Sequence, residues 1–196
     1  MQRLDAYSCQ LIDAVAAGSQ GPVCVAVSGG GDSLSLLNLA GTWAEKRGRD
    51  LLVLTIDHGL RPEAAKEARW VADLAHDRGI AAEILTWSPD KRSQNAARRA
   101  RHILLAEAAR KAGAGAVLLG HTLTDVVETL LMRLSRPVRL AGAVGPQPVS
   151  ICPVWPEGRG ILLARPLLAS RREELVADLE ASGQDWISDP SNDADY

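Results

Sequence analysis

Phenylalanine is absent from this chain, and aromatic residues make up only 4% of its 196 residues. Because 46% of the residues are nevertheless hydrophobic, we expect a core built from Ala, Leu and Val. The sequence also lacks an apolar run long enough to cross a bilayer, and its N-terminus is polar and soon acidic, unlike a signal peptide. These absences predict a cytoplasmic protein.

Cysteine and net positive charge are scarce as well. Cys9, Cys24 and Cys152 lie far apart, and no Cys-x-x-Cys pair is present. This spacing argues against a zinc site, an iron–sulfur cluster and a redox pair. The formal net charge is −2 at pH 7, so any contact with nucleic acid must be local.

Short apolar runs alternate with segments of helical periodicity over the first two thirds of the chain. The predicted strands are 22–27, 51–56, 80–87 and 114–119, and the predicted helices are 4–17, 32–46, 62–78, 93–111 and 122–134. This alternation predicts a doubly wound α/β fold, a mainly parallel sheet with helices on both faces. After a proline-rich stretch we expect short strands at 149–154 and 161–164, and a helix at 170–182 with Ser170 as its N-cap.

A glycine-rich turn joins the first strand to the helix that follows it. It reads Ser28-Gly29-Gly30-Gly31-Asp32-Ser33. Glycines let the backbone approach an anion closely, and a helix N-terminus attracts one. No Lys follows, as a Walker loop requires, and Leu34 stands where a dinucleotide loop needs its third Gly. Because Asp32 would repel a phosphate unless a cation lay between them, the turn predicts nucleotide phosphate with Mg²⁺.

Acidic residues follow the fourth strand at helical spacing. Asp125 and Glu128 are three residues apart and share one helix face, next to His121. They can bind Mg²⁺ jointly with Asp32, or they can simply complement the helix dipole. His121 is placed close to the predicted phosphates.

Two other polar groups are open to two interpretations each. Arg98 and Arg101 share one face of a predicted helix and either receive phosphate groups or form a solvated basic face. His58 lies in the loop after the second strand, which in doubly wound folds often meets the ribose or the base. A histidine in a loop can equally be an ordinary surface residue.

The glycine turn resembles the PP-loop signature, S-G-G-x-D-S, of the ATP pyrophosphatase superfamily. The order of the later motifs resembles one branch of it, the tRNA(Ile)-lysidine synthases. The matching pieces are residues 28–33, 57–62, Ala97-Arg98-x-x-Arg101, 120–121, Asp125-x-x-Glu128-Thr129, 131–134, Arg165-Pro166-Leu167-Leu168 and Trp186-x-x-Asp189-Pro190-Ser191-Asn192.

This resemblance implies a two-step ligase reaction. ATP adenylates the C2 carbonyl oxygen of the wobble cytidine of a tRNA(Ile) with a CAU anticodon, and L-lysine then displaces AMP. The implied ATP-binding residues are Ser28, Gly29, Gly30, Gly31, Asp32, Ser33, His58 and His121. The implied catalytic residues are Asp32, Asp125, Glu128, Arg98, Arg101 and Arg133, of which the three acids would hold Mg²⁺.

The sequence departs from the family pattern in several places. Thr124 stands where the family commonly has an acid, His102 where it usually has Tyr, and Pro137 and Arg139 replace a flexible Arg-Gly-Ser-Gly loop. Typical members continue past the position of the last residue here. We therefore expect residues 1–184 to form the catalytic domain and 185–196 to begin a linker to a C-terminal tRNA-binding region.

Three alternatives to the ligase stay open at this point. A related PP-loop tRNA thiolase would need cysteines placed for sulfur transfer, which the isolated cysteines do not provide. An amidoligase acting on a small molecule would suit the near-neutral charge. The altered segment 137–142 would suit an ATP-binding remnant without full catalysis.

Overall fold

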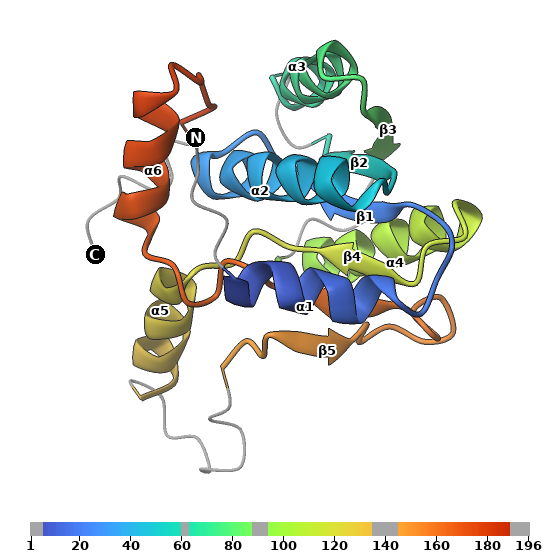
Figure 1. The fold of residues 1–196 in the computed structure, drawn as a ribbon. Helices are drawn as coiled ribbons and strands as arrows, with labels where there is room; N and C mark the ends of the chain where they lie inside the picture. The colour runs from blue at the N-terminus through green and yellow to red at the C-terminus, as the bar shows by residue number, and fades with distance from the viewer. Residues whose placement is uncertain (1–5, 60–62, 88–93, 135–144, 189–196) are drawn as a thin grey trace.

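A computed structural model describes residues 6–59, 63–87, 94–134 and 145–188 of the chain. In chain order its elements are α1 (Ala6–Ala16), β1 (Val23–Ala26), α2 (Gly31–Arg47), β2 (Leu51–Asp57), α3 (Ala64–Asp77), β3 (Ala81–Thr86), α4 (Gln94–Lys111), β4 (Ala116–Leu118), α5 (Leu123–Leu134), β5 (Val149–Ile151), β6 (Leu162–Ala164) and α6 (Arg172–Ala181) (Figure 1). None of the helices in these ranges is long and apolar enough to cross a membrane.

The strands form one six-stranded sheet in the order β3-β2-β1-β4-β6-β5. All neighbouring pairs are parallel except β5 and β6, which are antiparallel. The predicted doubly wound fold is thus confirmed. The antiparallel edge strand arises because β5 and β6 are joined by a short connection on one side of the sheet, not by a helical crossover.

The direction of the chain through the sheet decides which face each helix covers. The path runs outward from β1 through β2 to β3, and right-handed crossovers place α2 and α3 on one face. It then returns past β1 to β4, so α4 lies on the opposite face. The strand order therefore reverses between β1 and β4, which is where doubly wound sheets bind their ligands.

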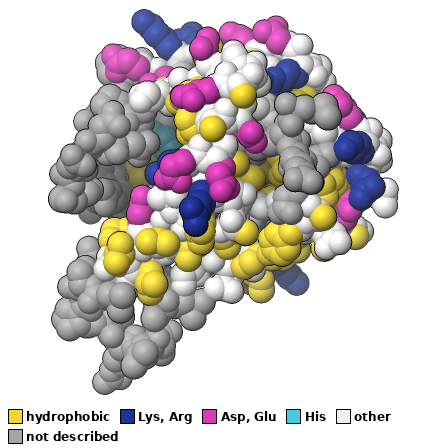
Figure 2. All heavy atoms as spheres, turned by 60° about the vertical axis from the view of Figure 1, so that its left-hand side comes forward, with side chains coloured by type: hydrophobic (Ala, Val, Ile, Leu, Met, Phe, Trp, Pro, Cys, Tyr) yellow, Lys and Arg dark blue, Asp and Glu magenta, His cyan; other side chains and the backbone are white. Residues whose placement is uncertain are grey.

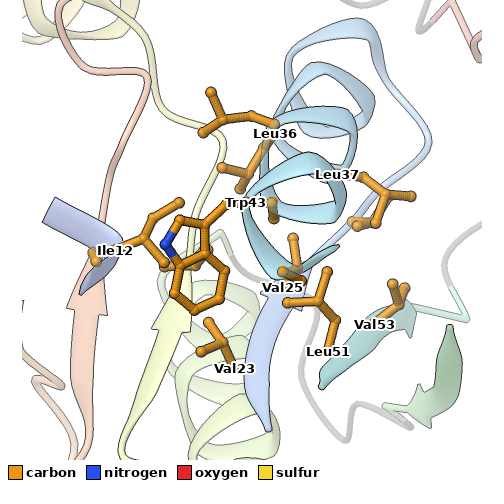
Figure 3. Packing of buried hydrophobic residues seen from close by; sticks show 14 of the residues in the cluster. Ile12, Val23, Val25, Leu36, Leu37, Trp43, Leu51 and Val53 are labelled. Atoms are coloured by element: carbon orange, nitrogen blue, oxygen red, sulfur yellow. The ribbon is translucent and has the colours of Figure 1, made fainter. Parts of the chain in front are cut away.

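Each face of the sheet has its own hydrophobic cluster. Along β1, Val23 and Val25 point into the cluster formed with α1, α2, α3 and α6, while Cys24 and Ala26 point toward α4. Figure 3 shows Trp43 of α2 packed between Ile12 and Val23 in the first cluster. Trp43 is 2% exposed and donates its Nε1–H to Asp13 Oδ1 at 2.9 Å. The remainder of both clusters is mostly Ala, Leu and Val, as the composition predicts.

The start of α6 differs by one residue from its prediction. The N-cap is Arg171, and its backbone N–H donates to Glu174 Oε2 at 3.5 Å. Ser170 lies before the cap because its backbone is used elsewhere: its N–H donates to Leu167 O, and its carbonyl accepts from Leu123 N–H at 3.0 Å. The last bond ties the start of α5 to the chain just before α6, so the two helices meet at the carboxyl edge of the sheet.

Candidate functional site

The glycine turn is closed by the hydroxyl of Ser33. Its Oγ donates to Gly30 O at 2.8 Å and accepts from Ser28 N–H at 3.2 Å. Gly29 has a φ of 92°, a conformation that side chains rarely adopt. Helix α2 begins at Gly31, and no side chain of the described residues caps it. A helix N-terminus left in this state is suited to an anion.

A cavity of about 900 Å³ opens at this turn, between the carboxyl ends of β1, β2 and β4. Nine of the predicted site residues line it: Ser28, Gly30, Gly31, Asp32, Ser33, His58, Arg101, His121 and Asp125. They come from the loops after β1, β2 and β4 and from helices α2, α4 and α5, and the topology of the sheet brings them together. This volume is large enough for a nucleotide-sized ligand.

Three predicted acids converge on one arginine that the sequence did not point to. Arg172, the first residue of α6, donates from Nε to Asp32 Oδ2 at 2.9 Å. Its other nitrogens lie 3.7 Å from Asp125 Oδ1 and 3.8 Å from Glu128 Oε1. Figure 2 shows acidic and basic side chains next to one another on this face, with hydrophobic side chains below them. The acids thus already share a positive group supplied by the chain itself.

The two carboxylate oxygens of Asp125 have different partners, one at the start of α5 and one in the cavity. Its Oδ2 accepts from Thr122 N–H at 2.7 Å and from Thr122 Oγ1 at 2.8 Å, which satisfies the first turn of α5. Its Oδ1 faces Arg172. The two interpretations of this acid, helix complement and site residue, are therefore compatible.

Asp32 is partly buried in the cavity wall. Burial raises its pKa, and the neighbouring Arg172 guanidinium opposes that rise. Its Oδ1 is buried and has no hydrogen-bond partner among the described residues. A buried carboxylate oxygen without a partner is costly, and such groups are typical of functional sites.

A second group beside the cavity contains arginines and two histidines, and of these Arg101 and His121 line the cavity. Burial, together with Arg101, lowers the pKa of both His121 and His102 to about 4. Arg165 donates from Nε to His121 Nδ1 at 3.2 Å and is itself buried. Both imidazoles are therefore neutral near pH 7, and the positive charge of this wall comes from arginine.

The loop after β2 contributes an aromatic contact. His58 packs edge-on against Trp87, with ring centroids 6.2 Å apart and an interplanar angle of 88°. Burial lowers the pKa of His58, and its buried Nδ1 has no hydrogen-bond partner among the described residues. His58 lines the cavity on the side of the loop after β2, where a base or ribose would lie.

The sequence profile of the PP-loop domain matches residues 5–196, which is almost the whole chain. The chain belongs to the PP-loop family. Membership implies that it uses ATP.

Curated relatives of this PP-loop chain share one name. A tRNA(Ile)-lysidine synthase from Hyphomonas neptunium is 50% identical over 172 residues, which cover 88% of this chain and 47% of that protein. Another from Caulobacter vibrioides is 40% identical over 193 residues, covering 97% of this chain and 46% of that protein. The chain spans about half the length of the curated relatives it matches.

Solved structures confirm the PP-loop fold. A tRNA thiolase from Methanococcus maripaludis with a [4Fe-4S] cluster aligns with a TM-score of 0.70, at 14% identity, over 93% of this chain and 65% of that chain. An NH3-dependent NAD synthetase from Campylobacter jejuni aligns with a TM-score of 0.53, at 15% identity, over 93% of this chain and 75% of that chain. At such identities the likeness concerns the fold alone.

Some predicted PP-loop site residues lie away from the cavity wall. Arg98 is exposed, Glu128 reaches the cavity only through Arg172, and Gly29 is buried behind the turn. The side chain of Arg133, the segment 135–142 and the motif 189–192 lie outside the described residues. Their roles stay predictions.

Several residues that line the cavity were not among the predicted site residues, and some of them lie in α6 or after it. Arg172, Trp186, Ile187 and Ser188 line the cavity. Arg172 carries no local signal, because its acid partners are 44 to 140 residues away in sequence. Trp186 begins a motif that carried the family resemblance, and that motif was the available signal. The predicted linker from residue 185 therefore begins within the cavity wall, and the domain boundary stays a prediction.

The site fits the ATP that the family implies, on two observations. The cavity has the required size, and its turn offers an uncapped helix N-terminus. The fit for Mg²⁺ is different. No group of His, Cys, Asp or Glu within the described ranges is arranged to hold a metal ion. Arg172 instead lies among the three acids that were expected to bind Mg²⁺.

Proposed function

We propose that this chain is the catalytic part of an ATP-dependent ligase acting on tRNA(Ile) with a CAU anticodon. It would adenylate the C2 carbonyl oxygen of the wobble cytidine and then join L-lysine at that carbon, releasing pyrophosphate and AMP. The observation that carries the proposal is the match to tRNA(Ile)-lysidine synthases at 40–50% identity over most of this chain. This function places the chain in the cytoplasm with its tRNA.

The cavity supports the first half of this reaction. Backbone N–H groups at the start of α2 and the guanidinium of Arg101 would hold the phosphate chain of ATP, so that its α phosphorus can be attacked by the carbonyl oxygen. Asp32, Asp125 and Glu128 would be free to hold Mg²⁺ only after Arg172 had moved away from them, and the ion would then neutralise charge on the phosphates. Arg101 would stabilise the departing pyrophosphate.

In this proposal Arg172 is a counter-ion that a metal ion must displace. Arg172→Met is expected to strengthen binding of Mn²⁺ to the nucleotide-free protein by about tenfold, measured by electron paramagnetic resonance of free Mn²⁺. That factor, about 1.4 kcal/mol, is below the roughly 4 kcal/mol between unit charges 4 Å apart at an effective dielectric of 20. Arg171→Met removes the same charge from an exposed neighbour and should change little. Weaker Mn²⁺ binding in Arg172→Met would contradict the assignment.

The function is tested by mixing the protein with ATP, radiolabelled lysine and a transcript of tRNA(Ile) bearing the CAU anticodon. We expect ATP-dependent incorporation of lysine into the RNA. A transcript with guanosine at the wobble position, which has no carbonyl at C2, should accept none. Pyrophosphate release without lysine transfer, or lysine transfer to a small molecule only, would overturn the proposal.

A thiolase function is not favoured by the cysteines of this chain. None of the three, all of which lie in the described part of the chain, forms a disulfide, and Cys24 and Cys152 are buried. Burial raises the pKa of Cys24 to about 12, so its thiolate is not available near neutral pH. The structural likeness to a tRNA thiolase therefore reflects the shared fold.

A further inference from the structure

Arg165 is a buried arginine whose bonds point in two directions. It follows β6 directly and is 8% exposed. Its Nη1 donates to Gln147 O at 2.7 Å and to Ser150 Oγ at 3.1 Å, which fixes the guanidinium against the segment leading into β5. Its Nε donates to His121 Nδ1 at 3.2 Å. The guanidinium thus connects this edge of the sheet to a residue that lines the cavity.

The direction of the last bond determines which nitrogen of His121 carries the proton. A guanidinium N–H can only donate, so Nδ1 must accept and carries no hydrogen. A neutral imidazole that accepts at Nδ1 has its proton on Nε2. The only ring nitrogen left for a ligand is therefore a donor.

We propose that Arg165 is a positioning residue that holds His121 as a neutral Nε2–H donor toward the phosphate chain of ATP in the cavity. This inference rests on the ATP use within the proposed function and assigns roles in it to Arg165 and His121. In the sequence, Arg165 is part of a motif that resembles the family pattern, and the sequence alone assigns it no role. The geometry supplies one, because the fork of its guanidinium reaches both the β5 side and the imidazole.

The charges around His121 favour a neutral donor over a cation. Arg101, Arg165 and Arg98 face it with positive charge, and Asp125 with negative charge. An imidazolium would add one more positive charge to this arginine-rich wall and would repel its neighbours. A neutral N–H still stabilises charge developing on a phosphate oxygen, and it would not hold the released pyrophosphate as tightly.

The first test is the ¹⁵N spectrum of the imidazoles in the ATP-free protein, with His121 assigned from its loss in His121→Gln. The expected wild-type signals at neutral pH are a pyridine-type nitrogen at Nδ1 and a pyrrole-type nitrogen at Nε2. In Arg165→Met, His121 is expected to titrate at a higher pH and to lose this single tautomer. A protonated Nδ1 in the wild type, or unchanged His121 signals in Arg165→Met, would overturn the inference. His76, exposed on α3, is the internal reference.

The second test measures binding of a non-hydrolysable ATP analogue by calorimetry. His121→Ala and Arg165→Met should each weaken binding about tenfold, and His121→Gln, which retains a neutral N–H donor, should stay within about threefold of wild type. Arg159→Met removes the same charge from an exposed arginine that stacks on Trp155, and should bind normally.

The two tests keep this inference separate from the proposed ligase. Should Arg165→Met fail to fold, His121→Ala against His121→Gln still decides whether a neutral donor matters, and equal binding by these two variants would refute the role. A protein that shows the expected tautomer and analogue binding but transfers no lysine would overturn the proposed substrate and leave the roles of Arg165 and His121 standing.

Discussion

Asp32→Asn is expected to abolish ATP cleavage, lowering the rate of AMP formation about a thousandfold or more, without unfolding the protein. The amide keeps the shape of the side chain but removes the negative charge that would bind a cation beside the phosphates. The measurement is AMP and pyrophosphate release with tRNA and lysine present. Asp73→Asn, which removes an exposed acid from α3, should keep wild-type activity.

The same variant carries a prediction for stability. Because burial raises the folded-state pKa of Asp32, its contribution to stability is present below the unfolded value of 3.8 and is lost as pH rises through the folded value. The charged carboxylate therefore costs stability at neutral pH. We expect the melting temperature of Asp32→Asn to equal or exceed that of wild type near pH 7, since Arg172 keeps Asp125 and Glu128 as partners. An inactive variant with a much lower melting temperature would show that Asp32 acts on folding.

Gly29→Val should destabilise the whole domain. At a φ of 92° a β-branched residue is strained by about 1–3 kcal/mol. A Cβ there would also meet Ile187 Cδ1, the movable end of a side chain, so the backbone strain and the repacking of the two branched Val methyl groups are expected to cost most. We expect the free energy of unfolding to fall by about 3 kcal/mol and the melting temperature by roughly 6–12 °C. Thermal denaturation followed by circular dichroism measures both.

Gly31→Ala is the matched control for Gly29→Val. It lies in the same turn, but an added Cβ would meet Val176 Cγ2 at 3.6 Å, which is ordinary contact. Its stability should therefore match wild type, and its ATP affinity should fall because Gly31 lines the cavity. Equal stability of Gly29→Val and Gly31→Ala would show that the packing of Ile187 on Gly29 is not what constrains the turn.

The fold was largely predictable because its signals are local. The apolar run that forms β2, the Gly that ends α2 in a left-handed conformation and the alternation of strand and helix are all visible within short windows. Boundaries moved by one to three residues, and the N-cap of α6 moved from Ser170 to Arg171. That shift depends on a bond between Ser170 and Leu123, a partner that no local pattern identifies.

The site was predictable where chemistry is concentrated in one motif and not where it depends on distant pairs. The glycine turn and the acid pair of α5 carry their own spacing, and strand order brings Asp32 and Asp125 together. Arg172 and Arg165 owe their importance to partners 140 and 44 residues away, which periodicity does not reveal. The sequence also could not predict which cation lies among the acids, because an arginine guanidinium and a metal ion can both pair with the same carboxylates.

The contact between Ile187 and the glycine turn limits where the protein can be truncated. Ile187 N–H donates to Gly29 O at 2.9 Å, and Trp186, Ile187 and Ser188 complete the cavity wall. The glycine motif ends at Ser33, yet the backbone of its turn is hydrogen-bonded by a segment that lies more than 150 residues later in the chain. Expression fragments that stop before residue 186 would carry the whole signature and still leave the turn without that support. A useful truncation series must therefore retain the chain through Ser188.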